Sequence, residues 1–169
     1  MNNGYLVTSP LGDIALRIHD DALTGLFFVG QKYFPELAYS ADERLVPRVV
    51  RQAREQLAEF FDGGRRGFDV PLAFRGTPFQ CRVWQELARI PYGTVVSYGA
   101  LARKMGLGSG HARAVGAANG RNPISIIVPC HRVIGDNGAL TGYAGGIERK
   151  QALLSLENAA GMPGRLALG

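Results

Sequence analysis

Apolar and polar residues alternate at the start of the chain in a pattern that predicts three short strands. The apolar runs are Tyr5–Val7, Ile14–Ile18 and Leu23–Val29. Residues 10–13 and 20–21 separate these runs, and their Pro, Gly and Asp favour the tight turns of an antiparallel meander. We therefore predict a small antiparallel sheet in this part of the chain.

A helical spacing of apolar residues follows over residues 42–61. The apolar positions recur every three or four residues, at Leu45, Val49, Ala53, Leu57 and Phe60. Pro47 falls in the first turn, where a helix tolerates proline, and Gly63-Gly64 supplies a stop. Residues 68–74 then predict one more strand.

The second half of the chain predicts four helices. Thr77-Pro78-Phe79-Gln80 combines an N-cap, a first-position proline and a capping-box glutamine, so a helix should run from there to about residue 89. Further helices are predicted at residues 98–105 after Ser97, at 111–119 and at 147–157. The glycine-rich residues 106–110 between two of them are typical of a helix-turn-helix unit.

These elements together predict an α+β protein. A small N-terminal α/β scaffold domain, residues 1–76, would hold the antiparallel sheet and one helix. A mainly helical C-terminal domain with the helix-turn-helix unit would cover residues 77–169. Nothing in the first half resembles a reactive constellation, so we expect the chemistry in the second.

Charge is divided unevenly between the halves. Residues 1–76 carry nine Lys or Arg against ten Asp or Glu, a net charge of −1, whereas residues 77–169 carry ten against four, a net charge of +6. A basic half suggests an anionic partner, and a nucleic-acid backbone is the commonest one. The alternative is a generally cationic surface.

The predicted helix at 111–119 consists almost wholly of small residues around one long cation, Arg113. Its surface of Ala112, Ala114, Gly116 and Ala117 would suit close approach to the narrow minor groove better than the reading of base edges in the major groove. The alternative is that small residues simply allow tight helix packing.

Composition excludes several classes of protein. No apolar run approaches the roughly 18 residues of a membrane span, and Met1–Pro10 lacks the basic and apolar regions of a secretory signal, so we expect a cytoplasmic protein with no membrane partner. Two cysteines cannot form a disulfide framework, and three histidines show no metal-ligand spacing. We expect reduced thiols, no metal, and a packing role for Cys81.

The candidate for chemistry is Cys130, in the segment Ile126-Ile127-Val128-Pro129-Cys130-His131-Arg132. An apolar β-branched run closed by proline predicts a buried strand, with Cys130 at its end. His131 and Arg132 would stabilise the thiolate, which is the nucleophilic form. The alternative is a structural cysteine, since free cysteine is among the most buried residue types.

A carboxylate in the last predicted helix is a candidate partner for the imidazole. Leu153, Leu154 and Glu157 lie three and four residues apart and share one helix face. A buried carboxylate needs a partner, so Glu157 would orient and charge His131. The alternative is that Glu157 merely ends the helix near its rim.

Three motifs of the second half resemble the active-site signature of the O6-alkylguanine-DNA alkyltransferases, also called methylated-DNA–protein-cysteine methyltransferases. They are Asn122-Pro123, Pro129-Cys130-His131-Arg132-Val133 and Gly142-Tyr143-Ala144-Gly145-Gly146. The resemblance covers residues 79–157, with Ser97-Tyr98-Gly99 and Ala112-Arg113-Ala114-Val115-Gly116 in the expected order. The first half fits only in size and coarse pattern.

The resemblance implies a direct-reversal DNA repair activity. Cys130 would take a methyl or other alkyl group from O6 of guanine, with O4 of thymine as a further candidate position, while His131 and Glu157 draw off the thiol proton through a water. Asn122 would be the hydrogen-bonded asparagine of the site, and Tyr98 would support protonation of guanine N3. The thioether product is a very poor leaving group, so each molecule would act once.

The resemblance also implies how DNA is bound. The partner would be double-stranded DNA carrying O6-alkylguanine, the protein would be a monomer when free, and no cofactor is implied. Arg113 would replace the flipped nucleotide in the stack, with Tyr98, Ala112, Ala114 and Gly116 at the DNA. The base pocket would comprise Tyr143, Val133 through its backbone carbonyl, Ala144 and Asn119.

Some features depart from relatives. Several relatives bind zinc in the first domain through residues that this chain lacks, and some place a large apolar residue where Asn119 stands, so this pocket would be more polar. Two other functions remain open: a lesion-sensing DNA-binding module without chemistry, and a Cys-His hydrolase. Adjacency of Cys130 and His131 weakens the hydrolase, because folds ordinarily bring such residues together from distant positions.

Overall fold

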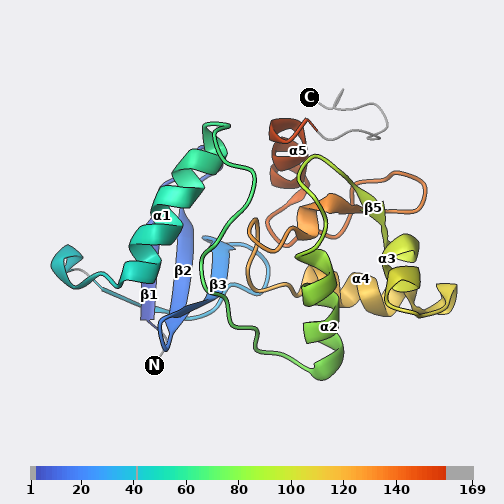
Figure 1. Ribbon diagram of the computed structural model, residues 1–169, viewed down its shortest axis with the longest axis horizontal. Coiled ribbons are helices and arrows are strands. Elements are labelled where there is room, and N and C mark those ends of the chain that lie inside the picture. The colour runs from blue at the N-terminus through green and yellow to red at the C-terminus, as the bar shows by residue number, and fades with distance from the viewer. Residues whose placement is uncertain (1–2, 41, 159–169) are drawn as a thin grey trace.

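The computed structural model describes residues 3–40 and 42–158, and it has the predicted α+β class. A four-stranded sheet and helix α1 lie on one side of the molecule, and helices α2 to α5 with a two-stranded sheet lie on the other (Figure 1). One hydrophobic core runs through both sides, from Leu16 in the sheet to Leu153 in the last helix.

The predicted meander is confirmed. Strands β1 (Asn3–Val7), β2 (Ile14–His19) and β3 (Ala22–Phe28) pair antiparallel in sequence order. A fourth strand that the pattern did not predict, β4 (Ala38–Tyr39), pairs parallel with β1, so the sheet order is β3-β2-β1-β4. Two residues are too few to show an alternating pattern.

The helical pattern of residues 42–61 divides into two elements. A 3₁₀ helix covers Glu43–Leu45, and helix α1 runs from Arg48 to Phe61 with Pro47 as its N-cap. The prediction of one helix over the whole range was wrong, because a proline disfavours helical conformation in the residue before it, and Val46 is extended. The apolar face of α1 packs on the sheet.

The strand predicted at residues 68–74 reduces to a single bridge. Leu72 pairs parallel with Leu23, held by hydrogen bonds from Leu23 N to Pro71 O (2.8 Å) and from Ala73 N to Leu23 O (3.0 Å). Pro71 has no N–H to donate, so pairing does not extend along the segment.

The helices of the second half lie where the sequence predicts them, within a few residues. The elements in chain order are α2 (Pro78–Leu87), β5 (Val96–Ser97), α3 (Tyr98–Lys104), a 3₁₀ helix (Ser109–His111), α4 (Ala112–Gly120), a 3₁₀ helix (Cys130–Arg132), β6 (Val133–Ile134) and α5 (Ile147–Leu156). The parallel pair β5 and β6 was not predicted. Helices α3 and α4 pack together as the predicted helix-turn-helix unit.

Strand β3 connects the two sides of the molecule. Leu26 N donates to Pro123 O (2.8 Å), and Ser125 N donates to Leu26 O (3.0 Å), so Ile124 forms a parallel bridge with the strand. The sheet therefore holds the chain five residues before Cys130. None of the described helices is long and apolar enough to cross a membrane.

The capping box of α2 gives a stability prediction. Gln80 N donates to the Thr77 hydroxyl (3.1 Å), and Thr77 N donates to the Gln80 side-chain oxygen (3.0 Å). Thr77→Ala removes this cap and should lower the free energy of unfolding by about 1 kcal/mol, as measured by urea denaturation. Thr77→Ser keeps the acceptor and is the control; equal losses in both variants would show that the cap is not responsible.

Candidate active site

The segment before Cys130 is a series of tight turns, so the strand predicted at 126–128 was wrong. Ile127 N donates to Ser125 O (2.8 Å) and Cys130 N to Val128 O (2.8 Å), and Ile126 has a positive φ of 71°. This conformation is strained for a β-branched residue, and such strain persists only where the surroundings fix the backbone.

Asn122 fixes this turn from inside. Its side-chain amide nitrogen donates to Val128 O (2.8 Å), and its oxygen accepts from Ile124 N (3.1 Å). The side chain is buried, so these bonds replace the strand ladder that the apolar run would otherwise form.

Cys130 begins a 3₁₀ helix rather than ending a strand, and only 4% of its surface is exposed. Burial raises the pKa of its thiol, while the Asn122 amide and the positive charge of Lys150 act in the opposite direction. Both cysteines of the chain are free, and Cys81 packs half-buried against the core as predicted.

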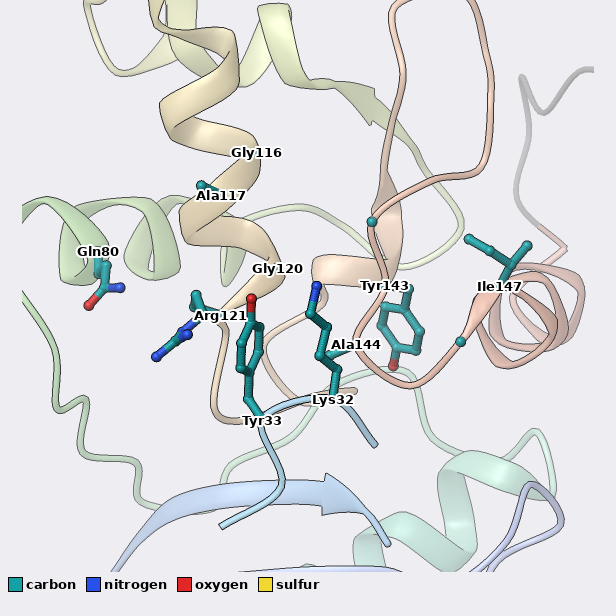
Figure 2. A pocket seen from close by; sticks show the side chains of 12 residues that line it. Lys32, Tyr33, Gln80, Gly116, Ala117, Gly120, Arg121, Tyr143, Ala144 and Ile147 are labelled. Atoms are coloured by element: carbon teal, nitrogen blue, oxygen red, sulfur yellow. The ribbon is translucent and has the colours of Figure 1, made fainter. Parts of the chain in front are cut away.

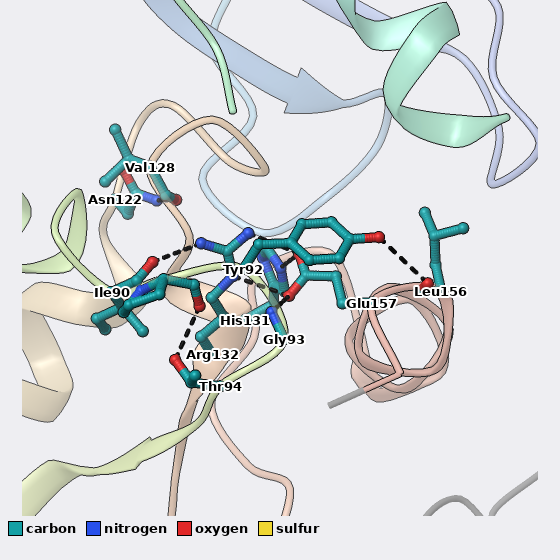
Figure 3. A network of polar contacts seen from close by, with 11 residues as sticks. Ile90, Tyr92, Gly93, Thr94, Asn122, Val128, His131, Arg132, Leu156 and Glu157 are labelled. Carbon is teal, nitrogen blue, oxygen red and sulfur yellow. Dashed lines mark hydrogen bonds and ion pairs between the residues drawn. The ribbon is translucent and has the colours of Figure 1, made fainter. Parts of the chain in front are cut away.

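Glu157 lies at the centre of a buried polar cluster (Figure 3). His131 Nε2 lies 2.8 Å from Glu157 Oε2. Arg132 donates from Nε to Oε1 and from Nη2 to Oε2, both at 2.8 Å, and from Nη1 to Ile90 O at 2.6 Å. The predicted pairing of Glu157 with His131 is present in the structure, and Glu157 is also the C-cap residue of α5.

The ionisation states follow from these contacts. Burial alone would raise the pKa of Glu157, but the hydrogen bonds from His131 and Arg132 and the charge of Arg132 lower it to about 2, so the carboxylate is ionised. Burial lowers the pKa of His131 despite Glu157, so its imidazole is neutral at pH 7. Nε2 then donates to the carboxylate, and Nδ1 is left as an acceptor without a partner in residues 3–40 and 42–158.

Arg132 lies two residues from Cys130 in the sequence, but its guanidinium pairs with Glu157. Its guanidinium binds both oxygens of Glu157 and a backbone carbonyl, so its charge neutralises the carboxylate. The expectation that Arg132 stabilises the thiolate was therefore wrong.

Lys150 is the buried cation that the sequence prediction missed. It has no exposed surface, its Nζ donates to Thr141 O (2.6 Å), and no described carboxylate pairs with it. Burial lowers its pKa to about 8, with the negative charge of the Cys130 thiolate acting against that shift. The helical spacing of Lys150 from Leu153, Leu154 and Glu157 was the signal that could have found it.

Three predicted pocket residues surround the Thr141 carbonyl and the loop after it. Tyr98 donates its hydroxyl to Thr141 O (3.2 Å), and burial raises its pKa. Gly142 has a positive φ of 71°, and a Cβ there would meet the Tyr98 hydroxyl at 3.0 Å, so glycine allows this approach. Tyr143 and Asn119 are buried, and among the described residues no polar atom lies within hydrogen-bond distance and geometry of their side-chain polar atoms.

Two cavities meet beside this loop. One, of about 350 Å³, is lined by Tyr98, Ala112, Arg113, Gly116, Asp136, Thr141 and Gly142. The other, of about 660 Å³, is lined by Gly116, Gly120 and Arg121 along α4 and its end, by the loop with Tyr143 and Ala144, and by Lys32 and Tyr33 (Figure 2). They share Gly116 and Gly142, so the cavities adjoin.

The remaining predicted residues take different positions. Arg113 is on the first turn of α4, where it lines the smaller cavity, and Ala114 is exposed beside it without lining either cavity. Val133 is fully buried in β6, where it pairs with Val96. Within residues 3–40 and 42–158, no group of three or more His, Cys, Asp or Glu side chains is placed to hold a metal ion.

Comparison with known proteins identifies the family. A family model described as 6-O-methylguanine DNA methyltransferase, DNA binding domain, matches residues 78–159. The methylated-DNA–protein-cysteine methyltransferase of Mycolicibacterium paratuberculosis is 50% identical over 151 residues, covering 89% of each chain. The constitutive enzyme of that name from Bacillus subtilis is 43% identical over 160 residues, covering 93% of this chain and 96% of its own.

A solved structure agrees over the same extent. The crystal structure of Mycobacterium tuberculosis OGT in complex with DNA superimposes with a TM-score of 0.83 at 47% identity, covering 92% of each chain. Half of the residues are thus shared with a relative over nearly nine-tenths of the sequence, and the fold extends through both halves. The chain therefore belongs to the methylated-DNA–protein-cysteine methyltransferase family.

Proposed function

We propose that this protein repairs DNA by moving an alkyl group from O6 of guanine to its own Cys130, in one turnover. One observation carries the proposal: the buried thiol of Cys130 is followed in the chain by a buried neutral imidazole, whose Nε2–H is held by an ionised carboxylate and whose Nδ1 has no partner among the described residues. The names of the relatives and the DNA complex of the mycobacterial protein support it.

The first step is loss of the thiol proton. His131 Nδ1 accepts it through a water, and the imidazolium that forms is stabilised by the Glu157 carboxylate 2.8 Å away. Glu157 is already paired with Arg132, so its orientation stays fixed while His131 changes charge. The Glu157 carboxylate thus holds the His131 ring in the tautomer that carries its proton on Nε2.

Lys150 would hold the negative charge that appears on sulfur. It is the buried cation whose charge lowers the pKa of the Cys130 thiol, since Arg132 is neutralised by Glu157. Its hydrogen bond to Thr141 O leaves two further N–H groups on the ammonium. A preorganised cation in a dry site stabilises a thiolate far more than the same charge in water does.

The second step is the transfer itself. The thiolate attacks the alkyl carbon, the C–S bond forms as the bond from that carbon to O6 breaks, and the electron pair remains on the guanine. Tyr98, hydrogen-bonded to Thr141 O, would support protonation of the departing base at N3. The thioether on Cys130 has no route back to a thiol, which makes the reaction irreversible.

The base must leave the helix to reach this sulfur. Cys130 is buried, so a nucleotide within a duplex cannot reach it, and extrusion costs a few kcal/mol. Arg113 is the long side chain of α4 at the cavity that Tyr98 also lines, and it would fill the gap left in the stack. The small residues Ala112 and Gly116 beside it would let α4 approach the minor groove.

The proposal predicts the stoichiometry of modification. Incubation with duplex DNA containing O6-methylguanine should add one methyl group per molecule, and peptide mass spectrometry should place it on Cys130. Cys81 should stay unmodified, and Cys130→Ser should take up no methyl group. Tight binding of the damaged duplex with Cys130 unmodified would indicate a lesion-sensing module instead, and continuous turnover would indicate a hydrolase.

The buried lysine predicts a change in the thiol. Lys150→Met removes the cation and should raise the pKa of Cys130, so labelling by iodoacetamide at pH 7 should be about tenfold slower if that pKa rises by one. The control is Lys104→Met, which removes an exposed lysine at the end of α3 and changes the net charge by the same amount. If the pKa of Cys130 in Lys150→Met equals that of the wild type, Lys150 does not stabilise the thiolate.

The same lysine predicts how stability depends on pH. Because its pKa falls from 10.5 to about 8 in the folded protein, the unfolded chain binds more protons between these values. The wild type should thus lose stability as pH falls from 10.5 to about 8, with the full loss present below 8. Lys150→Met lacks this loss and should show a flatter urea stability curve over that range; an equally steep curve would contradict the assignment.

The finger role of Arg113 predicts a difference between substrates. Arg113→Ala should slow repair of O6-methylguanine in duplex DNA by about tenfold or more, because the extruded nucleotide leaves a gap that nothing fills. The reaction with free O6-methylguanine base, which needs no extrusion, should change little. Single-turnover rates on both substrates test this, and equal losses would remove the role.

A further inference from the structure

We propose that Lys32 and Arg121 bind phosphate groups of the DNA backbone beside the everted nucleotide, and that the Tyr33 ring positions the Arg121 guanidinium for this contact. The N-terminal half of the chain would then touch DNA directly, besides holding the reactive turn in place. The position of the lesion at Cys130 comes from the proposed function, on which the inference rests, and the backbone contact is an addition that alkyl transfer itself does not require.

Two cations flank one aromatic ring at the edge of the cavity of about 660 Å³ (Figure 2). The guanidinium carbon of Arg121 lies 3.9 Å from the centre of the Tyr33 ring, and Lys32 Nζ lies 5.2 Å from it. A hydrogen bond from Arg121, and then the charge of Lys32, lower the pKa of the Tyr33 hydroxyl. An anion at this edge of the cavity would therefore meet two positive charges at once.

The loop that carries Lys32 and Tyr33 is held by hydrogen bonds on both sides. Tyr33 has a positive φ of 63°, although 50% of its surface is exposed. The buried Gln31 accepts from Phe28 N (2.9 Å) and donates to Lys32 O (3.2 Å). Lys32 N donates to Ala144 O (3.1 Å), which ties the loop to the second half of the chain. A strained backbone under an exposed ring adds little to the core, so it indicates a role at the surface.

Neither cation is neutralised by a carboxylate of the protein. Among the residues that the structure describes, Lys32 and Arg121 form no ion pair. Arg17 lines a neighbouring cavity of about 130 Å³ together with Tyr33 and Arg121, and within residues 3–40 and 42–158 it also pairs with no carboxylate. Like charges repel one another, so their grouping here makes the surface complementary to a polyanion.

Arg121 ends the helix that we propose approaches the minor groove. It is the C-cap residue of α4, and Arg113, Ala117 and Arg121 follow at intervals of four residues, so they lie along one side of the helix. A rise of about 1.5 Å per residue puts Arg121 roughly 12 Å along the helix from Arg113. Phosphates recur on each strand every ~3.4 Å of the DNA axis. With Arg113 in the groove, Arg121 and Lys32 would thus reach the backbone a few nucleotides away.

The two side chains suit phosphate in different ways. The planar fork of an arginine can donate to two phosphate oxygens, and stacking on an aromatic ring fixes the plane of that fork. A lysine adds a compact charge on a flexible stem. Contacts to phosphate position a protein on DNA without reading its sequence. Lys32 and Arg121 would therefore hold the damaged strand at the cavity whatever bases surround the lesion.

The test is the salt dependence of binding to a fluorescent duplex without a lesion, measured by anisotropy with the full chain. Each phosphate contact releases counterions, so the slope of log Kd against log salt concentration should fall by about one in Lys32→Gln and in Arg121→Gln. In the double variant it should fall by about two. The control is Arg48→Gln, which removes an exposed arginine at the start of α1, away from α4 (Figure 1), and should keep the slope of the wild type.

A further variant tests the ring separately from the charges. Tyr33→Leu keeps both cations and removes the surface on which Arg121 stacks, so it should weaken binding several-fold while the slope stays that of the wild type. A Kd equal to that of the wild type would remove the positioning role of Tyr33. The side chains of Lys32 and Arg121 are exposed, so the urea midpoints of the Gln variants should not fall, and a changed slope then reports a lost contact.

The outcomes distinguish the backbone contact from the proposed function. If Lys32→Gln and Arg121→Gln both keep the slope of the wild type, or if Arg48→Gln loses as much, the inference is overturned, while methyl transfer to Cys130 can stand. If the slopes fall as expected but a duplex with O6-methylguanine leaves Cys130 unmodified, the proposed function fails and the contact to the backbone stands.

Discussion

The ionised carboxylate of Glu157 is the constraint on which the site depends. It lies at the end of α5, and its two oxygens bind His131 from one side and the Arg132 fork from the other. Arg132 continues the connection to the Ile90 carbonyl just beyond α2. One buried charge thus ties the last helix, the reactive 3₁₀ helix and the end of α2 together. Its loss would leave a guanidinium buried without its partner, which costs several kcal/mol.

The N-terminal sheet contributes geometry rather than reactive groups. Strand β3 pairs with the backbone around Ile124, and Asn122 closes the turn from the other side, so the strained conformation of Ile126 is held from both directions. At the other end of the site, a Cβ on Gly145 would lie 2.9 Å from the ring of Phe28, so the loop after Tyr143 rests directly on the sheet. The sheet therefore fixes both the residues before Cys130 and the loop after Tyr143.

Local signals predicted much of the fold, and they failed where distant contacts decide the conformation. The Thr77–Gln80 capping box is a contact between neighbours, and it placed the start of α2 at Pro78, as observed. The apolar run Ile126-Ile127-Val128 has strong strand propensity, but Asn122 and β3 hold it in turns, which no pattern within the run could indicate.

The sequence predicted the chemical types of the site and one of its contacts, and it missed the contacts of Arg132 and Lys150. Glu157 was predicted with His131 because a buried carboxylate needs a partner, and the two lie 2.8 Å apart. The role of Arg132 was misjudged because the fold, not adjacency, determines that its fork binds Glu157 instead of facing the sulfur. Lys150 was missed because a lysine on a helix is ordinarily exposed, although it shares the face of the residues that were noticed.

Several features of the site lower the stability of the folded protein when no substrate is bound. In the part of the chain that the structure describes, Lys150 pairs with no carboxylate and Asn119 and Tyr143 have polar atoms without partners, while Ile126 has a strained backbone. Each feature lowers stability, whereas the buried polar residues Thr24, Gln31 and Gln56 elsewhere in the core are hydrogen-bonded. Local rules are broken together in this way mainly where function requires it. The thiolate proposed to form on Cys130 supplies the negative charge that Lys150 lacks, so this unfavourable term becomes favourable only during the proposed reaction. That difference between the free and the reacting state is the property by which binding lowers a barrier.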